Sequence, residues 1–337
     1  MRPAPFAIGS RAIGPGAACF VAAEVGGTHE GSVDEALRLI DAAFQAGADG
    51  ILFQIYATSR LVVQRHPDRR TLEKRELSPK AWSRILHAAA ASGLAVLAEP
   101  LDAVSVDVAV EGGAEALLLL ADASEDPLVL RGAVASGRPL LLGSRGGEAL
   151  RTLAAAEARP FAVVVGPADA PAALEELELS EIGTWRERLR LAVGFLDRSD
   201  GGSGFALAIP ALAVAHGADL VIKGLGRDRG LGGHDHPAAL SLEDFHRMVE
   251  WLRLAERAEG GELGRSPRKS VTDATRCAVA SGLIPRGSVL SADLVEFKRA
   301  DARFGGGFGP RELERMIGRR AARPIQADEI IREEMLE

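Results

Sequence analysis

Residues 20–32 read Phe20-Val21-Ala22-Ala23-Glu24-Val25-Gly26-Gly27-Thr28-His29-Glu30-Gly31-Ser32. The first half is a short apolar run that holds a single acid, which is typical of a strand buried on both faces. The second half is polar and rich in glycine, so it predicts a turn after the strand. Similar apolar runs recur along the chain, and each is followed by a longer amphipathic segment. This alternation predicts a series of βα units around a parallel sheet.

The repeated pattern yields eight such units. Strands are expected at Phe20–Val25, Gly50–Ile55, Ala95–Ala98, Ala116–Leu120, Pro139–Leu142, Phe161–Val165, Leu191–Leu196 and Leu220–Lys223. Helices are expected at Val33–Ala46, Pro79–Ser92, Val104–Glu111, Leu128–Ala135, Glu148–Glu157, Pro171–Leu179, Gly204–His216 and Leu242–Glu259. Glycines that would stop a helix in the left-handed conformation precede several strands, at Gly47, Gly93, Gly137 and Gly217. Eight units predict an α/β fold, a closed TIM (β/α)8 barrel, with a doubly wound open sheet as the alternative.

Composition limits the classes of partner. The chain has 337 residues, 47% of them hydrophobic, and a net charge of -7. This balance argues against a nucleic acid or an anionic membrane as partner. Cys19 and Cys277 are the only cysteines, which fits a reducing compartment. No leader segment and no apolar run of membrane-spanning length is recognisable, so we expect a cytoplasmic protein.

The pattern changes near the C-terminus. Residues 259–267 read Glu-Gly-Gly-Glu-Leu-Gly-Arg-Ser-Pro, which is typical of a linker. Short apolar pieces separated by turn residues follow, as in Gly282–Leu290, and they are too short for further βα units. We therefore expect a barrel over residues 1–259, a linker over 260–269 and a small second domain over 270–337.

The motifs together resemble those of the sialic acid (N-acetylneuraminate or nonulosonic acid) synthase family, whose chains join a TIM barrel to a small antifreeze-like (SAF) domain. The family turn "AEIG-x-NHNGS" is matched by residues 23–32, and "GPDHAASL" by residues 233–240. In the small domain, Ala292-Asp293-Leu294, Lys298-Arg299 and Ile317-Gly318 match family segments. The resemblance covers about residues 15–333.

The resemblance implies roles for several residues. Glu24 matches a catalytic glutamate that contacts the acyl sugar or positions water, and Asp235 matches an aspartate near substrate or metal-bound water. On spacing alone, each carboxylate could instead be structural. The other candidate substrate-binding residues that match family positions are His29, Gln54, Ser144, Ser199, His236 and Arg299. Arg145 and Lys223 are further candidates, because either could restore positive charge to the site. Ser144 lies in a glycine-rich loop that could also cradle an anion on its backbone N–H groups.

Two phosphate-binding lysines of the family are missing. The family segment "KFQ" reads Leu52-Phe53-Gln54 here, and the segment "KIxS" falls in the apolar run Leu117–Leu120. Glu99 replaces a small hydroxyl residue of the family. Charge-assisted contacts to phosphate contribute roughly 1.5–3 kcal/mol each, so the loss of two should weaken an anion site by orders of magnitude. Arg145 is the nearest candidate replacement, and a solvated loop arginine is the alternative reading.

The metal ligands of the family also differ. The family binds a divalent ion, Mn or Mg, through two histidines, and these positions are Gly201 and Gly224 here. Glycine has no ligating side chain, so the inherited metal site should be absent. A metal site relocated to His234 and His236 is the open alternative, because a His-x-His loop binds metal when a third ligand converges.

Arg299 matches an arginine that, in the family, reaches into the barrel of the partner subunit. The resemblance thus implies a domain-swapped homodimer, although a solvated surface arginine is the simpler reading. We expect either a divergent synthase that condenses phosphoenolpyruvate with an N-acyl amino-sugar aldehyde in surface-glycan biosynthesis, or a non-catalytic paralogue. The paralogue would bind a sugar acid or pair with an active synthase.

Overall fold

The computed structural model describes residues 6–145, 161–167, 169–227, 235–259, 276–300 and 306–337. The chain divides into two compact units, Met1–Gly264 and Arg265–Glu337. Three expectations fall outside the described residues: the helix Glu148–Glu157, the linker 260–269 and the position of His234. In the part of the chain that is described, no helix is long and apolar enough to cross a membrane.

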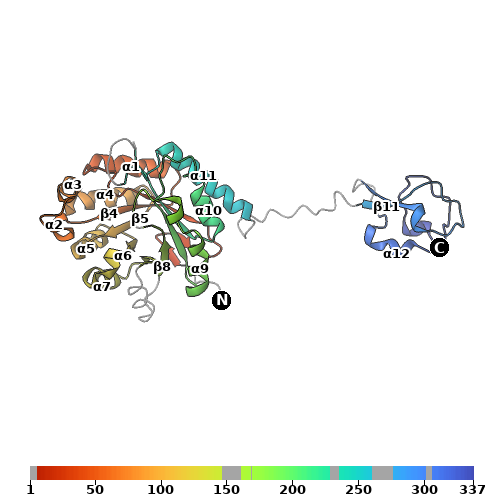
Figure 1. Cartoon of the computed structure of the whole chain (residues 1–337), viewed down its shortest axis with the longest axis horizontal. Coiled ribbons are helices and arrows are strands. Elements are labelled where there is room, and N and C mark those ends of the chain that lie inside the picture. The colour runs from red at the N-terminus through yellow and green to blue at the C-terminus, as the bar shows by residue number, and fades with distance from the viewer. Residues whose placement is uncertain (1–5, 146–160, 168, 228–234, 260–275, 301–305) are drawn as a thin grey trace. The chain divides into compact units, whose positions relative to one another are not determined.

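The first unit is a closed parallel barrel wrapped by helices (Figure 1). Its strands are β3 (Phe20–Glu24), β4 (Gly50–Ile55), β5 (Ala95–Pro100), β6 (Ala116–Leu119), β7 (Leu140–Gly143), β8 (Phe161–Val165), β9 (Val193–Asp197) and β10 (Leu220–Gly224). They pair in chain order, and β10 closes the ring against β3 with Gly224 opposite Glu24. The expected TIM barrel is confirmed, and closure of the ring excludes the open sheet.

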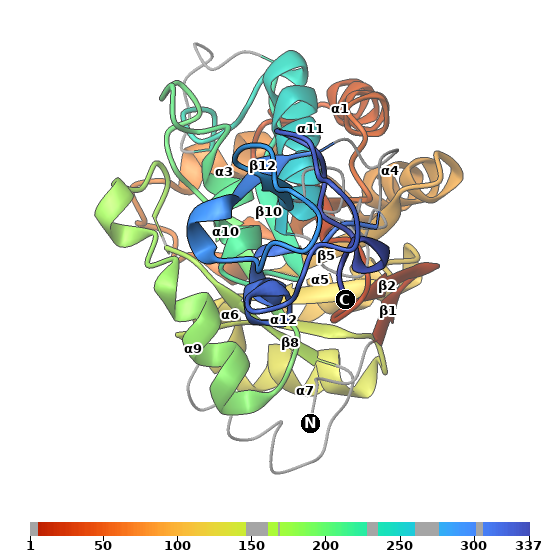
Figure 2. The ribbon, with the colours of Figure 1, turned by 90° about the vertical axis from the view of Figure 1, so that its right-hand side faces the viewer.

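The barrel is filled by layers of apolar side chains. Phe20, Ala22, Leu52, Leu97 and Leu118 belong to this interior cluster, and all are buried. At one end, β1 (Phe6–Ile8) and β2 (Arg11–Ile13) form an antiparallel hairpin (Figure 2). Ile8 and Ile13 of this hairpin join the same cluster, so the hairpin covers the barrel interior. The sequence analysis did not predict these two short strands.

Several helices of the barrel unit begin at a capping side chain. The helices described in this unit are α1 (Val33–Gln45), α2 (Thr58–Leu61), α3 (Arg69–Arg75), α4 (Pro79–Ala91), α5 (Ala103–Glu111), α6 (Ala121–Glu125), α7 (Pro127–Ala135), η1 (Leu174–Glu176), α9 (Ser180–Leu189), α10 (Ile209–Ala215) and α11 (Leu242–Glu259). Ser32 caps α1 by accepting a hydrogen bond from the Glu35 N–H, and Asp102 caps α5 in the same way. The four expected stop glycines all have positive φ, between 68° and 96°.

The prediction of a helix at Pro171–Leu179 is wrong. Most of that segment is irregular, with only the short 3-10 helix η1, and the true helix is α9 further along the chain. The reason lies at Ala172, whose N–H donates to the Arg198 carbonyl in a parallel bridge to the β9 end of the barrel. A backbone held extended by this bridge cannot start a helix. Likewise α10 begins later than expected, because turns occupy residues 201–207.

The second unit is a small β-rich body with its own core. It contains β11 (Arg276–Ala280), β12 (Val295–Arg299), α12 (Leu313–Met316) and the 3-10 helices η4 (Ala292–Leu294), η6 (Pro310–Glu312) and η7 (Glu333–Met335). β11 and β12 pair antiparallel, and isolated bridges join both halves of the unit. Ile284, Leu290, Met316 and Ile325 are buried in its core.

Candidate functional site

The polar layer of the barrel lies at the carboxyl ends of the strands. Side chains alternate between the two faces of a strand, so the residue two places beyond an inward apolar residue also faces inward. Glu24 therefore follows Ala22 into the barrel mouth, Gln54 follows Leu52, and Glu99 follows Leu97. Arg198 stands in the same relation to Leu196. This is the end at which TIM-barrel enzymes carry their reactive groups.

These strand ends form a pocket. Its lining combines carboxylates, one arginine and small residues: Glu24, Val25, Gly26, Thr28, Ala170, Asp197, Arg198, Gly224, Asp235 and Ala238. An Oε1 of Glu24 lies 3.7 Å from the Arg198 guanidinium, and both side chains are largely buried. Glu24 and Asp235, the two expected catalytic residues, thus lie in one pocket.

Two of the carboxyls here are hard to ionise. Burial raises the pKa of Glu24, and Arg198 partly offsets that rise. Burial raises the pKa of Glu99 to about 7, and the Glu24 charge adds to the rise. The Gln54 amide donates to Glu99 Oε2 at 3.2 Å. Near neutral pH the Glu99 carboxyl is therefore poised to gain or lose a proton.

Lys223 is fully buried, and it lies on the same face of β10 as Val221, which packs toward the helices rather than into the barrel interior. Its Nζ is 3.2 Å from Asp197 Oδ1 and donates to the carbonyl and hydroxyl of Ser199 at 3.0 and 3.1 Å. Desolvation lowers the pKa of the Lys223 ammonium, while Asp197 opposes that change. Both residues expected to bind substrate here, Ser199 and Lys223, are thus engaged with each other. Asp197 Oδ2 is buried and has no hydrogen-bond partner among the described residues.

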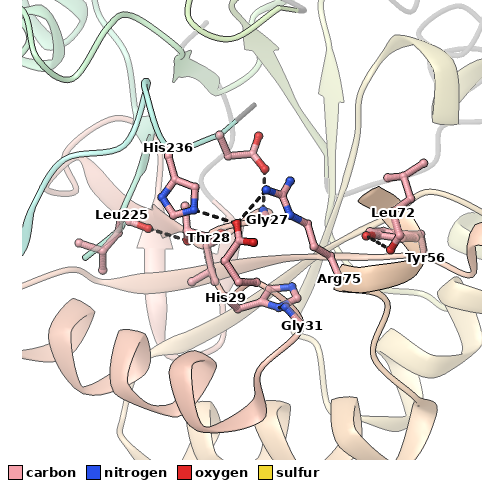
Figure 3. Close-up of polar contacts among 12 residues, drawn as sticks. Gly27, Thr28, His29, Gly31, Tyr56, Leu72, Arg75, Leu225 and His236 are labelled. Atoms are coloured by element: carbon pink, nitrogen blue, oxygen red, sulfur yellow. Dashed lines mark hydrogen bonds and ion pairs between the residues drawn. The ribbon is translucent and has the colours of Figure 1, made fainter. Parts of the chain in front are cut away.

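The turn after β3 is held from two sides. Arg75 donates to Glu30 Oε1 at 2.7 Å, and His236 Nε2 lies 2.9 Å from the same oxygen. Figure 3 shows the Arg75 and His236 side chains approaching this turn from opposite directions. Asp235 Oδ2 accepts a hydrogen bond from the Gly27 N–H at 2.6 Å. These contacts fasten the loop that carries Asp235 and His236 to the pocket rim.

His29 is packed inside the protein rather than in the pocket lining. Only 1% of His29 is exposed, and its ring meets the edge of Trp82 at a centroid distance of 5.6 Å. Its Nδ1 accepts the Gly31 N–H, as Figure 3 shows. Burial and the Arg75 charge lower the pKa of His29 to about 4. The geometry supports a structural role in the turn for this expected substrate ligand.

Gly201 and Gly224 stand where the resemblance places two metal-binding histidines, and backbone atoms occupy the space that a side chain would need at either position. A Cβ on Gly201 would lie 2.9 Å from the Ala239 carbonyl carbon and closer still to its oxygen. A Cβ on Gly224 would lie 3.1 Å from the Ala239 Cα. Hydrogen bonds hold this loop in place, from the Gly201 N–H to Pro237 and from the Leu240 N–H to Gly224, both at 2.8 Å. The residues therefore do not fit the divalent ion that the resemblance implies.

No group of three or more metal-ligating side chains occurs among the residues that the structure describes. His236 points its Nε2 at Glu30, and its Nδ1 is buried without a hydrogen-bond partner in the described part of the chain. Since His234 lies outside the described residues, the relocated site stays a hypothesis.

The positions where the resemblance places phosphate-binding lysines are apolar in this chain. Leu52 and Leu118 are fully buried in the barrel interior. Ser144 and Arg145 line a second hollow beside β7, together with apolar residues such as Leu120 and Leu196. The Arg145 side chain is 59% exposed and lies 3.5 Å from Glu178, so its charge is already paired at the surface.

Arg299 belongs to the second unit. It ends β12 directly opposite Arg276 of β11, and both side chains are exposed. Directly opposed residues of an antiparallel pair share a face, where two like charges repel each other. The pair is therefore available to an anionic group, and a role for Arg299 in the barrel stays a prediction.

Arg198, Arg75 and Asp197 were not selected from the sequence. Arg198 follows β9 and is the cation that faces Glu24, Glu99 and Asp235. Because Arg198 stands at a strand end, immediately before Ser199-Asp200, its position in the sequence could have marked it as a site residue. Arg75 had no such indication, because its contact with Glu30 joins residues 45 positions apart.

The fold and site define a (β/α)8-barrel protein with a carboxylate-rich pocket at the strand ends and a small C-terminal β unit. The NeuB family model matches residues 39–263 and the SAF domain model matches residues 275–337. The chain belongs to the NeuB family.

Relatives and solved structures match most of the chain. An uncharacterized protein of Methanocaldococcus jannaschii is 28% identical over 96% of both chains. Pseudaminic acid synthase of Campylobacter jejuni is 25% identical over 93% of this chain and 95% of its own. The crystal structure of the spore coat polysaccharide biosynthesis protein SpsE from Bacillus subtilis superposes with a TM-score of 0.67 at 26% identity, covering 99% of each chain.

Proposed function

We propose that this chain is a divergent member of its family that binds a sugar-type ligand in the barrel pocket without condensing it with phosphoenolpyruvate. The observation that carries the proposal is the backbone of Ala238 and Ala239, which fills the space beside Gly201 and Gly224. A divalent ion that polarises an aldehyde needs ligands at a fixed geometry. With those two positions closed, the described part of the pocket does not offer the two metal ligands of the family reaction.

The apolar floor supports the same conclusion. Phosphoenolpyruvate carries a phosphate and a carboxylate, and Leu52 and Leu118 offer neither group a charge. Arg198, the cation facing the pocket, is surrounded by Glu24, Glu99 and Asp235. The pocket therefore favours ligands that are rich in hydroxyl donors over anions. The relatives point to glycan biosynthesis as the setting, since pseudaminic acid synthase and a spore coat polysaccharide biosynthesis protein are among them.

A second candidate is the condensation reaction itself, acting on an N-acyl amino-sugar aldehyde. The observation that favours it is the retention of Glu24 and Asp235 in one pocket. In that case Glu24 positions the water and Arg198 supplies the positive charge.

One experiment separates the two candidates. Phosphate release from phosphoenolpyruvate is measured on the full chain, with and without Mn2+, against a panel of N-acyl aldoses, beside elemental analysis of the same sample. We expect no aldose-dependent phosphate and no stoichiometric metal. In parallel, titration calorimetry with phosphoenolpyruvate should give no heat at millimolar concentration. Aldose-dependent phosphate release, or binding of phosphoenolpyruvate tighter than about 100 µM, roughly -5.5 kcal/mol, would overturn the proposal.

A further inference from the structure

A second hollow of the barrel mouth lies at the ends of β6, β7, β8 and β9. Its apolar lining includes Val164 and Leu196, which belong to the apolar cluster of the barrel interior, and Leu120, which packs against that cluster. Ser144 carries the one side-chain hydroxyl among the described lining residues. The hollow therefore differs in chemistry from the carboxylate-lined pocket that holds Glu24.

Backbone atoms set the width of this hollow. The Ser144 N–H donates to the Val164 carbonyl at 2.8 Å, and a Cβ on Gly143 would lie 3.3 Å from the Leu120 Cα. The free volume of the hollow is about 40 Å³. One water molecule needs roughly 10–15 Å³ by the same measure, so the hollow has room for about three non-hydrogen atoms.

The lining of the hollow favours an apolar group over an anion. Arg145 is the one charged side chain among the described lining residues, and it is 59% exposed and lies 3.5 Å from Glu178. An anion placed against Leu120, Val164 and Leu196 would lose hydration without gaining a cation. Leu120 is only half-buried, so an aliphatic group in contact with it would remove further apolar surface from water.

One ligand can reach both parts of the mouth. Leu196 of β9 lines the apolar hollow, and Arg198, two residues further along the chain, lines the carboxylate-lined pocket. Both side chains face inward. Two residues of a strand span roughly 6–7 Å, a distance that a sugar ring with a short substituent can bridge.

We propose that the sugar ligand carries an aliphatic chain of about three carbons, which occupies this hollow while the sugar hydroxyls lie in the carboxylate-lined pocket. Leu120 and Leu196 contact the chain, and the Ser144 hydroxyl is available to the polar atom that attaches it. Acyl and alkyl groups share this chemistry. This inference rests on the proposed function, because it names a substituent of the ligand of the same site.

Two ligand series test this inference by titration calorimetry of the full chain at pH 7. One consists of mannosamine and glucosamine with N-acetyl, N-propanoyl or N-butanoyl groups. The other consists of the methyl, ethyl and propyl glycosides of mannose and glucose. We expect the affinity in at least one series to rise about fourfold with each added CH2 group, the ratio that corresponds to about 0.8 kcal/mol. The series that rises identifies the chain as acyl or alkyl.

Leu120→Asn replaces an apolar wall of the hollow by a polar side chain of similar shape. It should reduce the rise per CH2 group to less than about twofold and leave the affinity for the shortest ligand nearly unchanged. A purely structural effect would lower all affinities alike. Leu128→Asn alters an exposed leucine on α7 and should leave both series as they are. Thermal unfolding checks that each variant is folded, and the series on the unaltered chain test the inference if one is not.

The outcomes are distinct. If the affinity stays level or falls with chain length in both series, the inference fails while the sugar-binding function stands. An unchanged rise in Leu120→Asn would place the chain elsewhere and overturn the assignment of this hollow. If no sugar of either series gives heat at about 10 mM, the inference and the proposed function both fail. Binding of phosphoenolpyruvate in the same assay would contradict the proposed function alone.

Discussion

Substitution of Gly201 by alanine should destabilise the barrel unit, because the added methyl group has no room. The Cβ would lie 2.9 Å from the Ala239 carbonyl carbon and 3.4 Å from that of Ala238, and both are backbone atoms. The loop can yield only by weakening the hydrogen bond from the Gly201 N–H to Pro237. Overpacking costs about 1–3 kcal/mol and a lost hydrogen bond about 1 kcal/mol. We expect a total loss of about 2–4 kcal/mol.

Chemical denaturation of the full chain measures this loss, supported by thermal scans. For a unit of this size the thermal midpoint should fall by about 4–16 °C. Gly204→Ala is the matched control, since nothing lies within 4 Å of its added Cβ and it stands in the same loop. Its effect should stay within about 0.5 kcal/mol. Equal stability of the two variants would mean that Gly201 has free space, and the argument that backbone fills the metal-ligand position would be refuted.

Three further outcomes are expected from the site. The pKa of Glu99 is raised from 4.5 to about 7, so between these pH values the folded chain binds more protons than the unfolded chain. The stability of the folded chain should therefore fall as the pH rises from 4.5 to about 7. Glu99→Gln should remove up to about 3 kcal/mol of that fall when denaturation is measured as a function of pH. The pKa of His29 is lowered to about 4, so its ring should show no titration by NMR above pH 5, and its contribution to stability should be lost as pH falls from 6.5 toward 4. Arg75→Met leaves Glu30 without its guanidinium, and since that carboxylate side chain is 41% exposed, the loss in denaturation should be only about 1–2 kcal/mol.

The sequence was sufficient to predict the barrel because apolar periodicity is a local property. The run that ends in Glu24 and the helix Leu242–Glu259 are found as expected, since burial on both faces of a strand and along one side of a helix leaves a direct pattern. The helix expected at Pro171–Leu179 failed for the opposite reason. Its backbone is held by the pairing of Ala172 with the end of β9, and no local pattern reports a partner that is distant in sequence.

The site was predictable where one residue type fixes the chemistry. Gly201 and Gly224 predict the loss of two metal ligands on sequence grounds alone, because glycine cannot ligate through a side chain, and this stays a prediction. The role of Arg198 was not predictable, since an arginine in a loop is usually solvated. Only the closed barrel, which brings β3, β5 and β9 to one mouth, sets its guanidinium among Glu24, Glu99 and Asp235.

The differences from the family pattern are physically connected. The glycines at 201 and 224 allow the backbone around Ala239 to approach the strand ends, and this approach holds the loop that carries Asp235 and His236. Asp235 then bonds to the Gly27 N–H and His236 to Glu30, so the loop closes onto the turn after β3. The glycines at the predicted metal-ligand positions and the attachment of the loop thus belong to one structural arrangement. Restoring a histidine at position 201 would displace the loop before it rebuilt a metal site, and a pocket organised around carboxylates would remain.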